Sequence, residues 1–300
     1  MRRVTFAILL LAATSAFAQS EVAAGVRLIR GGFVPGQQPD GNTIILRAPE
    51  GLIVFDTGRH VEHTRKILDL AGNEKIAAVI NSHWHLDHIG GNALIRRERP
   101  DVRVYASGAL AEARKGFLAN YRRQLVEMGA DKFKAEIDLI DAGESLAPDF
   151  VIAKSGPMTI AGRELQVGLE TFAVTAGDVW VFDPRSGVLI AGDLVTLPAP
   201  FLDTACPARW KDALDRIAKM NFELVIPGHG APLTHRQFDQ YRRAFTNLLA
   251  CTGEKSKCAE GWIGDVSALI APAEVEFTRQ LMGYYVDVAR REPGGWCGGG

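Results

Sequence analysis

The stretch His83-Trp84-His85-Leu86-Asp87-His88 places three histidines and one carboxylate within six residues. It follows an apolar run at residues 76–80, which predicts a buried strand, and it precedes the pair Gly90-Gly91. The cluster therefore lies on a loop at the C-terminal end of a strand, where open α/β sheets keep their binding sites. Because neutral imidazole and carboxylate together suit zinc or a similar first-row metal, the stretch predicts a metal site.

Hydrophobic periodicity on both sides of this stretch alternates between strand and helix, which is the pattern of an α/β layer. Strands are predicted at residues 26–29, 43–46, 52–55, 76–80, 102–105, 158–160, 164–169, 179–182 and 188–191. Helices are predicted at residues 60–70, 93–97, 107–128, 205–220, 234–250 and 273–291, with a mixed connector over 135–148. Because the strands fall into two separate runs, we expect two sheets packed face to face with helices outside.

Three further stretches share the position of the histidine cluster, at or just after the end of an apolar run. Residues 54–58 read Val-Phe-Asp-Thr-Gly, residues 189–193 read Leu-Ile-Ala-Gly-Asp, and residues 226–230 read Ile-Pro-Gly-His-Gly. Together with His-x-His-x-Asp-His and Gly-Gly, they resemble the signature of the metallo-β-lactamase superfamily over roughly residues 25–232. The resemblance implies an α/β fold, an αββα sandwich of two mixed β-sheets with helices on the outer faces.

The resemblance also implies a set of metal ligands and Zn²⁺ as the cofactor. Carried over by position, the ligands are His83 and His85 in a first site, Asp87, His88 and His229 in a second site, and Asp193 as a bridge between them. Asp87 is in addition the expected catalytic residue, and Asp56 is expected to orient a ligand without touching the metal. Asp193 favours the glyoxalase II-like branch, because true β-lactamases of this fold do not usually carry the bridging aspartate.

One position departs from the family pattern. The third histidine of the first site normally stands in a Gly-His-Thr stretch, and here Val174 occupies its place before Thr175. Valine has no atom that binds a metal. We therefore expect one tightly bound zinc ion in the second site and a weakened first site. The substitutes considered for the missing ligand are Glu170, His60, His63 and His235.

Composition bounds the partners and the compartment. A chain of 300 residues with 47% hydrophobic content can bury a large core, and its formal net charge of −1 favours neither nucleic acid nor an anionic membrane. The N-terminus has two arginines, an apolar run and an Ala-Phe-Ala site, which predicts a signal peptide over residues 1–18. We therefore expect a periplasmic or secreted protein without a membrane segment after cleavage, acting on a small molecule.

The cysteines fit an oxidising compartment. The four cysteines allow three pairings, of which we favour Cys251 with Cys258 across a short polar loop. Cys206 would then pair with Cys297 and hold the glycine-rich tail. The expected domains are a metallo-β-lactamase-like domain over residues 25–250 and a helical extension over residues 251–300 packed on it.

The function that the resemblance implies is a secreted zinc-dependent hydrolase, in which a metal-bound hydroxide attacks an ester, thioester or amide-type substrate. The loops at residues 31–41 and 198–206 are expected to shape its pocket. A β-lactam hydrolase is the first alternative, which the compartment favours. The second alternative is a non-catalytic metal-binding or partner-binding protein on the same fold, which Val174 favours. The oligomeric state has no signal in the sequence.

Overall fold

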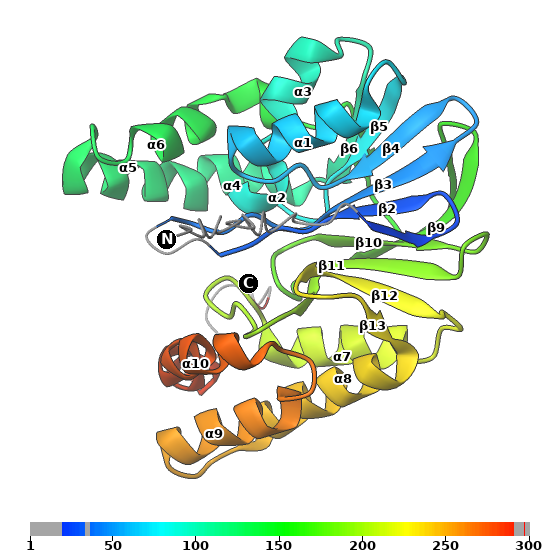
Figure 1. Cartoon of the computed structure of the whole chain (residues 1–300). Coiled ribbons are helices and arrows are strands. Elements are labelled where there is room, and N and C mark those ends of the chain that lie inside the picture. Colours follow the sequence, from blue (N-terminus) through cyan, green and yellow to red (C-terminus); the bar gives the residue numbers. More distant parts are fainter. Residues whose placement is uncertain (1–19, 34–36, 291–296, 298–300) are drawn as a thin grey trace, which may run out of the picture.

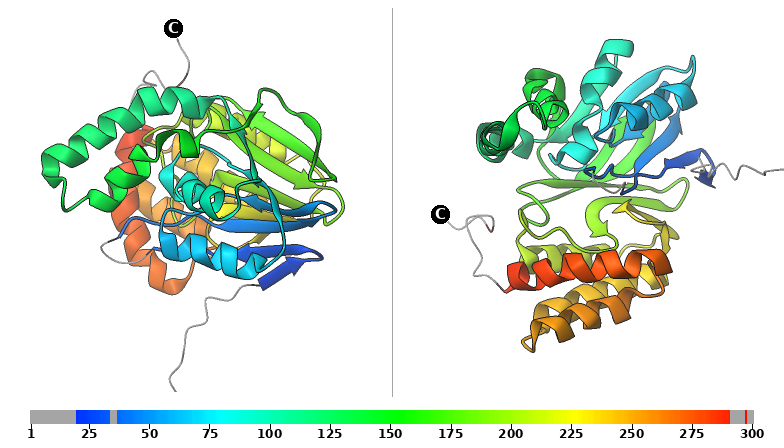
Figure 2. Two further views of the ribbon diagram at one scale, coloured as in Figure 1. Left: turned by 90° about the horizontal axis from the view of Figure 1, so that it is seen from above. Right: turned by 60° about the vertical axis from the view of Figure 1, so that its left-hand side comes forward.

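The computed structural model describes residues 20–33, 37–290 and 297. Within them, strands β1 to β7 form a seven-stranded sheet in sequence order, and a six-stranded sheet has the order β13-β12-β11-β10-β9-β8. The two sheets face each other, with α1 and α3 outside the first and α7 and α8 outside the second (Figure 1). The turned views keep this layering (Figure 2). The αββα sandwich expected from the sequence is therefore confirmed.

The first sheet is mixed. Its strands are β1 (Ser20–Ala23), β2 (Val26–Ile29), β3 (Thr43–Ala48), β4 (Gly51–Phe55), β5 (Ile76–Ile80), β6 (Arg103–Ser107) and β7 (Phe150–Ile152). Strands β1 to β4 pair antiparallel, whereas β4 to β7 pair parallel. The parallel strands place their C-terminal ends at one edge, and β5 runs there directly into the histidine cluster.

The second sheet is also mixed. Its strands are β8 (Gly156–Ile160), β9 (Arg163–Glu170), β10 (Asp178–Asp183), β11 (Val188–Thr196), β12 (Leu224–His229) and β13 (Leu233–Thr234). Only β11 and β12 pair parallel among these described strands. The two parallel strands carry Asp193 and His229 toward the same end of the sheet.

The helices cover the outer faces and form one edge of the molecule. They are α1 (Val61–Ala71), α2 (Leu86–Ile89), α3 (Asn92–Glu98), α4 (Ala109–Lys115), α5 (Phe117–Gly129), α6 (Lys134–Asp141), α7 (Pro207–Ile217), α8 (His235–Ala250), α9 (Lys255–Val266) and α10 (Val275–Ala289), with short 3₁₀ turns at Gly143–Leu146 and Pro272–Glu274. In the described part of the chain no helix combines the length and hydropathy that crossing a bilayer would require.

Two predictions about the helices were wrong. The helix expected over residues 107–128 is broken into α4 and α5 at Gly116, because glycine is a poor helix former and its backbone has φ −100° and ψ −95° there. The connector expected over 135–148 contains α6, whose Ile137 is buried and whose Ile140 packs against an apolar cluster beside the histidine loop. Burial of this face stabilises a helix that its mixed sequence did not indicate.

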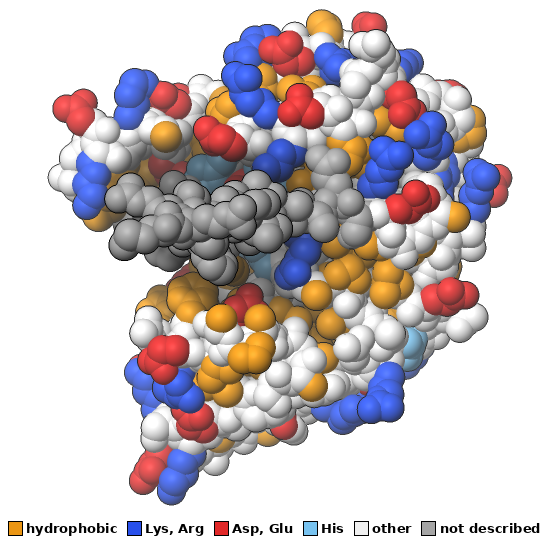
Figure 3. Space-filling view, in the orientation of Figure 1, with side chains coloured by type: hydrophobic (Ala, Val, Ile, Leu, Met, Phe, Trp, Pro, Cys, Tyr) orange, Lys and Arg blue, Asp and Glu red, His pale blue; other side chains and the backbone are white. Residues whose placement is uncertain are grey.

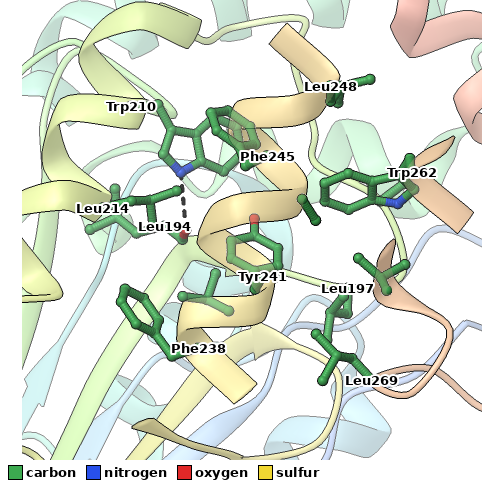
Figure 4. Packing of buried hydrophobic residues seen from close by; sticks show 14 of the residues in the cluster. Leu194, Leu197, Trp210, Leu214, Phe238, Tyr241, Phe245, Leu248, Trp262 and Leu269 are labelled. Carbon is green, nitrogen blue, oxygen red and sulfur yellow. Dashed lines mark hydrogen bonds between the residues drawn. The ribbon is translucent and has the colours of Figure 1, made fainter. Parts of the chain in front are cut away.

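The core has two main parts. Alternate residues of both sheets, such as Ile53, Phe55, Val181 and Ile190, meet between the sheets. A larger cluster lies under α7, α8 and α9, where Trp210, Tyr241 and Trp262 pack (Figure 4).

Hydrogen bonds from this second part of the core fix the loop that follows the sheet. The Trp210 indole donates to the Leu194 carbonyl at 3.0 Å, and the Trp262 indole donates to the Pro198 carbonyl at 2.9 Å. The Tyr241 hydroxyl accepts from the Thr196 N–H at 3.2 Å. Three buried side chains therefore fix the position of the end of β11, just after Asp193, and of the start of the following loop.

Both expected disulfides are present. Cys251 pairs with Cys258, and Cys206 pairs with Cys297. Cys258 lies within α9, so the polar stretch between the first pair is partly helical. The second disulfide ties the chain beyond α10 to the residue that precedes α7. Helices α9 and α10 pack against each other and against α8, and the domain boundary at residue 251 stays a prediction.

Candidate metal centre

Four elements bring the expected ligands to one point. His83 and His85 stand on the loop after β5, and the short helix α2 begins immediately afterwards, so Asp87 and His88 lie on its first turn. Asp193 stands in β11 just after Gly192, which has φ +54° at a break in the pairing register with β12. A side chain at Gly228 would lie 2.0 Å from an Asp193 carboxylate oxygen. Glycine at that position therefore allows the strand that ends in His229 to approach the carboxylate.

The side chains form two groups whose potential ligand atoms lie within 4.8 Å of one another, His83 with His85 and Asp193, and Asp87 with His88 and His229. Asp193 touches both groups. One of its oxygens lies 3.7 Å from Nε2 of His83, and the other lies 3.3 Å from Nε2 of His88 and 3.6 Å from Nε2 of His229. This is the division into two sites with a shared carboxylate that the family resemblance implied. Metal ligation by these residues stays a prediction.

Asp56 and Ser82 determine how two of the imidazoles are oriented. Asp56 has φ +60°, a left-handed conformation that aspartate tolerates, and its carboxylate accepts from the Ser82 N–H and the Ser82 hydroxyl, both at 2.7 Å. It also accepts from Nδ1 of His88 at 2.7 Å. Because the Ser82 proton is used on Asp56, Ser82 Oγ accepts from Nδ1 of His83 at 2.8 Å. In both histidines the Nε2 lone pair therefore faces the centre, as metal ligation requires.

Thr204 determines the orientation of the third imidazole. Its hydroxyl donates to the Val174 carbonyl at 3.0 Å, so it accepts from Nε2 of His85 at 2.9 Å. The remaining nitrogen of His85, Nδ1, then carries a lone pair and lies 2.8 Å from Nε2 of His83. Two acceptors at this distance repel each other unless a cation lies beside them.

Two buried atoms at the centre have no hydrogen-bond partner within the described residues. They are Nε2 of His88 and one carboxylate oxygen of Asp193. Buried polar atoms are normally satisfied, and leaving one unpaired costs about 1–3 kcal/mol. Both atoms are good zinc ligands and both face the same point, so the donor set fits a bound metal.

The titration behaviour of the cluster is consistent with that fit. Burial lowers the pKa of His85 to about 4, and burial together with the neighbouring histidines lowers the pKa of His83 well below its ordinary value. Burial alone would raise the pKa of Asp87, but the charge of His88 and the hydrogen bond from His229 hold it well below its usual range. Burial alone would lower the pKa of His88, but Asp193, Asp87 and Asp56 raise it well above. The carboxylates thus attract positive charge to the centre, which a proton on His88 would supply without metal and a bound metal ion would supply in its place.

The substitutes considered for the missing third histidine lie elsewhere. Val174 is fully buried among apolar side chains. Glu170 pairs with Arg216 and accepts from the Trp180 indole at 3.1 Å. The three histidines also have other contacts: His60 with Asp40, His63 with Thr43 and His235 with Phe222. Among the described residues, none of these side chains joins the two ligand groups.

The centre forms the floor of a cavity of about 450 Å³. Figure 3 shows a hollow in the side of the molecule between α5 and α10, with hydrophobic side chains gathered on its α10 side. Both loops expected to shape the pocket contribute, through Phe33 and through Phe201. Helices α5 and α10 supply most of the remaining wall, which the sequence did not indicate.

Arg59 is a site residue that sequence reasoning missed. Its guanidinium lies 3.5 Å from one Asp87 oxygen and forms an ion pair with Glu136 of α6. The other Asp87 oxygen is left facing His229, at 2.9 Å from Nε2. Arg59 thus holds the carboxylate by one oxygen and leaves the second for the centre. Its position directly after the Asp-Thr-Gly turn was the available signal, because that turn ends β4 beside the metal loop.

The sequence profile of the metallo-beta-lactamase superfamily matches residues 37–229, which span the whole candidate centre. The chain belongs to this superfamily. A curated relative, the linear primary-alkylsulfatase of Pseudomonas sp. (strain ATCC 19151), is 27% identical over an alignment of 229 residues, and the alignment covers 64% of this chain but only 42% of that protein. The chain therefore spans less than half the length of the relative.

Solved structures of the superfamily share the fold. A β-lactamase domain protein from Burkholderia ambifaria has a TM-score of 0.59 at 21% identity, covering 91% of this chain and 88% of its own. A metallo-β-lactamase from Pontibacter korlensis has a TM-score of 0.58 at 21% identity, covering 76% of this chain and 98% of its own. At these identities the likeness establishes the architecture alone.

Proposed function

We propose that the protein is a zinc-dependent hydrolase, exported from the cytoplasm, that acts on small ester, thioester or amide-type substrates. The observation that carries the proposal is the convergence of two ligand groups on Asp193 at the floor of a cavity, with two buried donor atoms unpaired. Membership of the superfamily and the alkylsulfatase relative both support hydrolysis as the reaction class. Export rests on the sequence of residues 1–18, which lies outside the described residues.

The chain's own residues have distinct parts in this proposal. When bound, zinc would activate water as a nucleophile and polarise the substrate oxygen. His83, His85, Asp87, His88, Asp193 and His229 would hold it. Asp56 and Thr204 keep lone pairs of three imidazoles aimed at the centre. Asp87 lies in the cavity wall, where its ionised carboxylate would accept a hydrogen bond from the attacking water and orient it.

The test combines metal analysis with an assay. Protein purified from the periplasm would be analysed for zinc and then screened with thioesters, lactones, carboxylic esters, alkyl sulfates and β-lactams, with Asp193→Asn as the inactive control. We expect zinc-dependent turnover of at least one ester or thioester that Asp193→Asn lacks. Zinc binding without turnover of any class would instead favour the non-catalytic alternative. Turnover restricted to β-lactams would favour the β-lactamase alternative.

A further inference from the structure

We propose that the cavity above the metal centre is a subsite for the apolar chain of an uncharged ester. This inference rests on the proposed hydrolase function and names the substrate class. It is carried by two independent features of the wall, its aromatic and aliphatic lining and the pairing of its cationic side chain.

Apolar side chains line opposite walls of the cavity. On one wall, Trp84 packs against Phe117 of α5 with 5.0 Å between ring centroids, and Leu118 lies next to them. On the facing wall stand Phe277 and Leu281 of α10. Ligand pockets with such linings bind mainly through burial of apolar surface, with few polar contacts setting orientation.

The mouth of the cavity is apolar as well. Phe33 and Phe277 are 41% and 38% exposed, and their ring centroids lie 5.2 Å apart. Phe33 also lies 5.7 Å from the ring of His229, so the apolar mouth leads directly to the candidate ligands. Exposed apolar groups that rim a cavity of this kind mark a binding surface. A chain entering here would bury both rings.

The charged groups of the wall disfavour an anionic group beside Arg59. Among the described residues that line the cavity, Arg59 is the only lysine or arginine. The Arg59 side chain is only 10% exposed, and its guanidinium is already paired with Asp87 and Glu136. Binding a sulfate or carboxylate there would break a buried ion pair and leave Glu136 facing a second negative charge. An uncharged ester meets neither cost.

The cavity volume of about 450 Å³ accommodates a chain of several methylene groups. Each methylene buried from water is worth at most about a fourfold gain in binding. We therefore expect kcat/KM of the zinc-loaded protein for p-nitrophenyl esters to rise at least tenfold from acetate to octanoate. A flat or falling series would overturn the subsite.

Matched variants locate the effect. Phe277→Gln and Leu281→Gln should each lower kcat/KM for the octanoate several-fold more than for the acetate. Phe150→Gln is the control, because Phe150 is 48% exposed, lies outside the cavity and undergoes the same replacement. Equal effects of Phe277→Gln and Phe150→Gln would contradict the assignment.

A binding measurement separates the subsite from the proposed function. Calorimetric titration of the zinc-loaded protein with 2-nonanone, which has no bond to hydrolyse, should show binding that Phe277→Gln weakens and Phe150→Gln does not. Binding of this ketone without turnover of any ester would remove the hydrolase and keep the subsite. Ester turnover without ketone binding would remove the subsite and keep the hydrolase. Faster turnover of octyl sulfate than of the octanoate ester would overturn the charge argument.

Discussion

The hydroxyl of Thr204 lies 2.9 Å from Nε2 of His85, beside the position where the family carries its third histidine. The same hydroxyl donates to the carbonyl of Val174 at 3.0 Å. Thr204 thus links His85 to the backbone of Val174, the residue that lacks a ligand atom. Thr204 provides no replacement ligand in this arrangement, but it fixes which nitrogen of His85 can bind.

Removing this hydroxyl should weaken the first metal site. Thr204→Val keeps the shape of the side chain but frees His85 to rotate or change tautomer. Hydrogen bonds of this kind typically contribute 10–100-fold to metal affinity, so a loss of about that size is expected at the His83–His85 site. Competition titration against a chromophoric chelator measures it. Thr204→Ser is the control and should bind zinc like the wild type, whereas an unchanged affinity of Thr204→Val would contradict the assigned role.

Arg59 should be required for stability as well as for the position of Asp87. Arg59→Met leaves two buried carboxylates, Asp87 and Glu136, without their shared partner. Breaking a buried pair in this way costs about 3–5 kcal/mol of unfolding free energy. Urea unfolding of the metal-free protein measures the loss. Adding Glu136→Gln should restore part of it, and strictly additive effects of the two replacements would show that the ion pair carries no coupling.

His63 should make the protein sensitive to acid. Burial lowers its pKa from 6.5 to about 4, so the unfolded chain binds a proton between these pH values and the folded chain does not. The contribution of neutral His63 to the free energy of unfolding is therefore complete above pH 6.5. It is lost as the pH falls toward 4, and the loss amounts to about 3 kcal/mol at pH 4.

The variant His63→Gln tests this contribution. Glutamine can keep a hydrogen bond to Thr43, which lies 2.9 Å from Nε2 of His63, but it does not titrate. Its unfolding free energy, measured without metal, should fall less between pH 6.5 and pH 4 than that of the wild type. Parallel pH profiles of the two proteins would exclude His63 as the source.

The sequence anticipated the parts of the centre that lie in short motifs. His83, His85, Asp87 and His88 lie within six residues, and Asp193 and His229 each follow an apolar run, so each could be assigned by position. Thr204 could not, because its contact with His85 spans 119 residues and depends on how the loop after β11 folds back. The pair of Arg59 and Glu136 spans 77 residues and rests on α6, a helix that the sequence did not indicate.

The helices likewise show features that local sequence predicts and features that depend on packing between distant segments. Thr234 caps α8, accepting from the Gln237 N–H at 3.3 Å. Such a cap is local and can be read from four residues. Helix α9 was missed, because the neighbouring cysteines suggested only a polar loop. Its buried residues Trp262, Ile263 and Val266 gain their stabilisation from packing on α8, which no local pattern reports.

The last prediction concerns how many metal ions the centre holds. Asp87, His88 and His229, with a share of Asp193, form a complete ligand set, whereas the His83–His85 group lacks a third histidine. The two unpaired atoms support this order, because Nε2 of His88 belongs to the complete set and the unpaired Asp193 oxygen lies 3.3 Å from it. We therefore expect one tightly bound zinc ion per chain after dialysis.

Two variants under one dialysis protocol test the order of the sites. Removing a ligand from a complete set should cost far more affinity than removing one from an incomplete set, so His229→Ala should abolish tight binding and His83→Ala should reduce it less. His235→Ala is the control, since His235 stacks on Phe222 away from the centre and should leave the zinc content at the wild-type value. Two tightly held zinc ions in the wild type would refute the prediction. The His83–His85 site would then be complete with Asp193 and water.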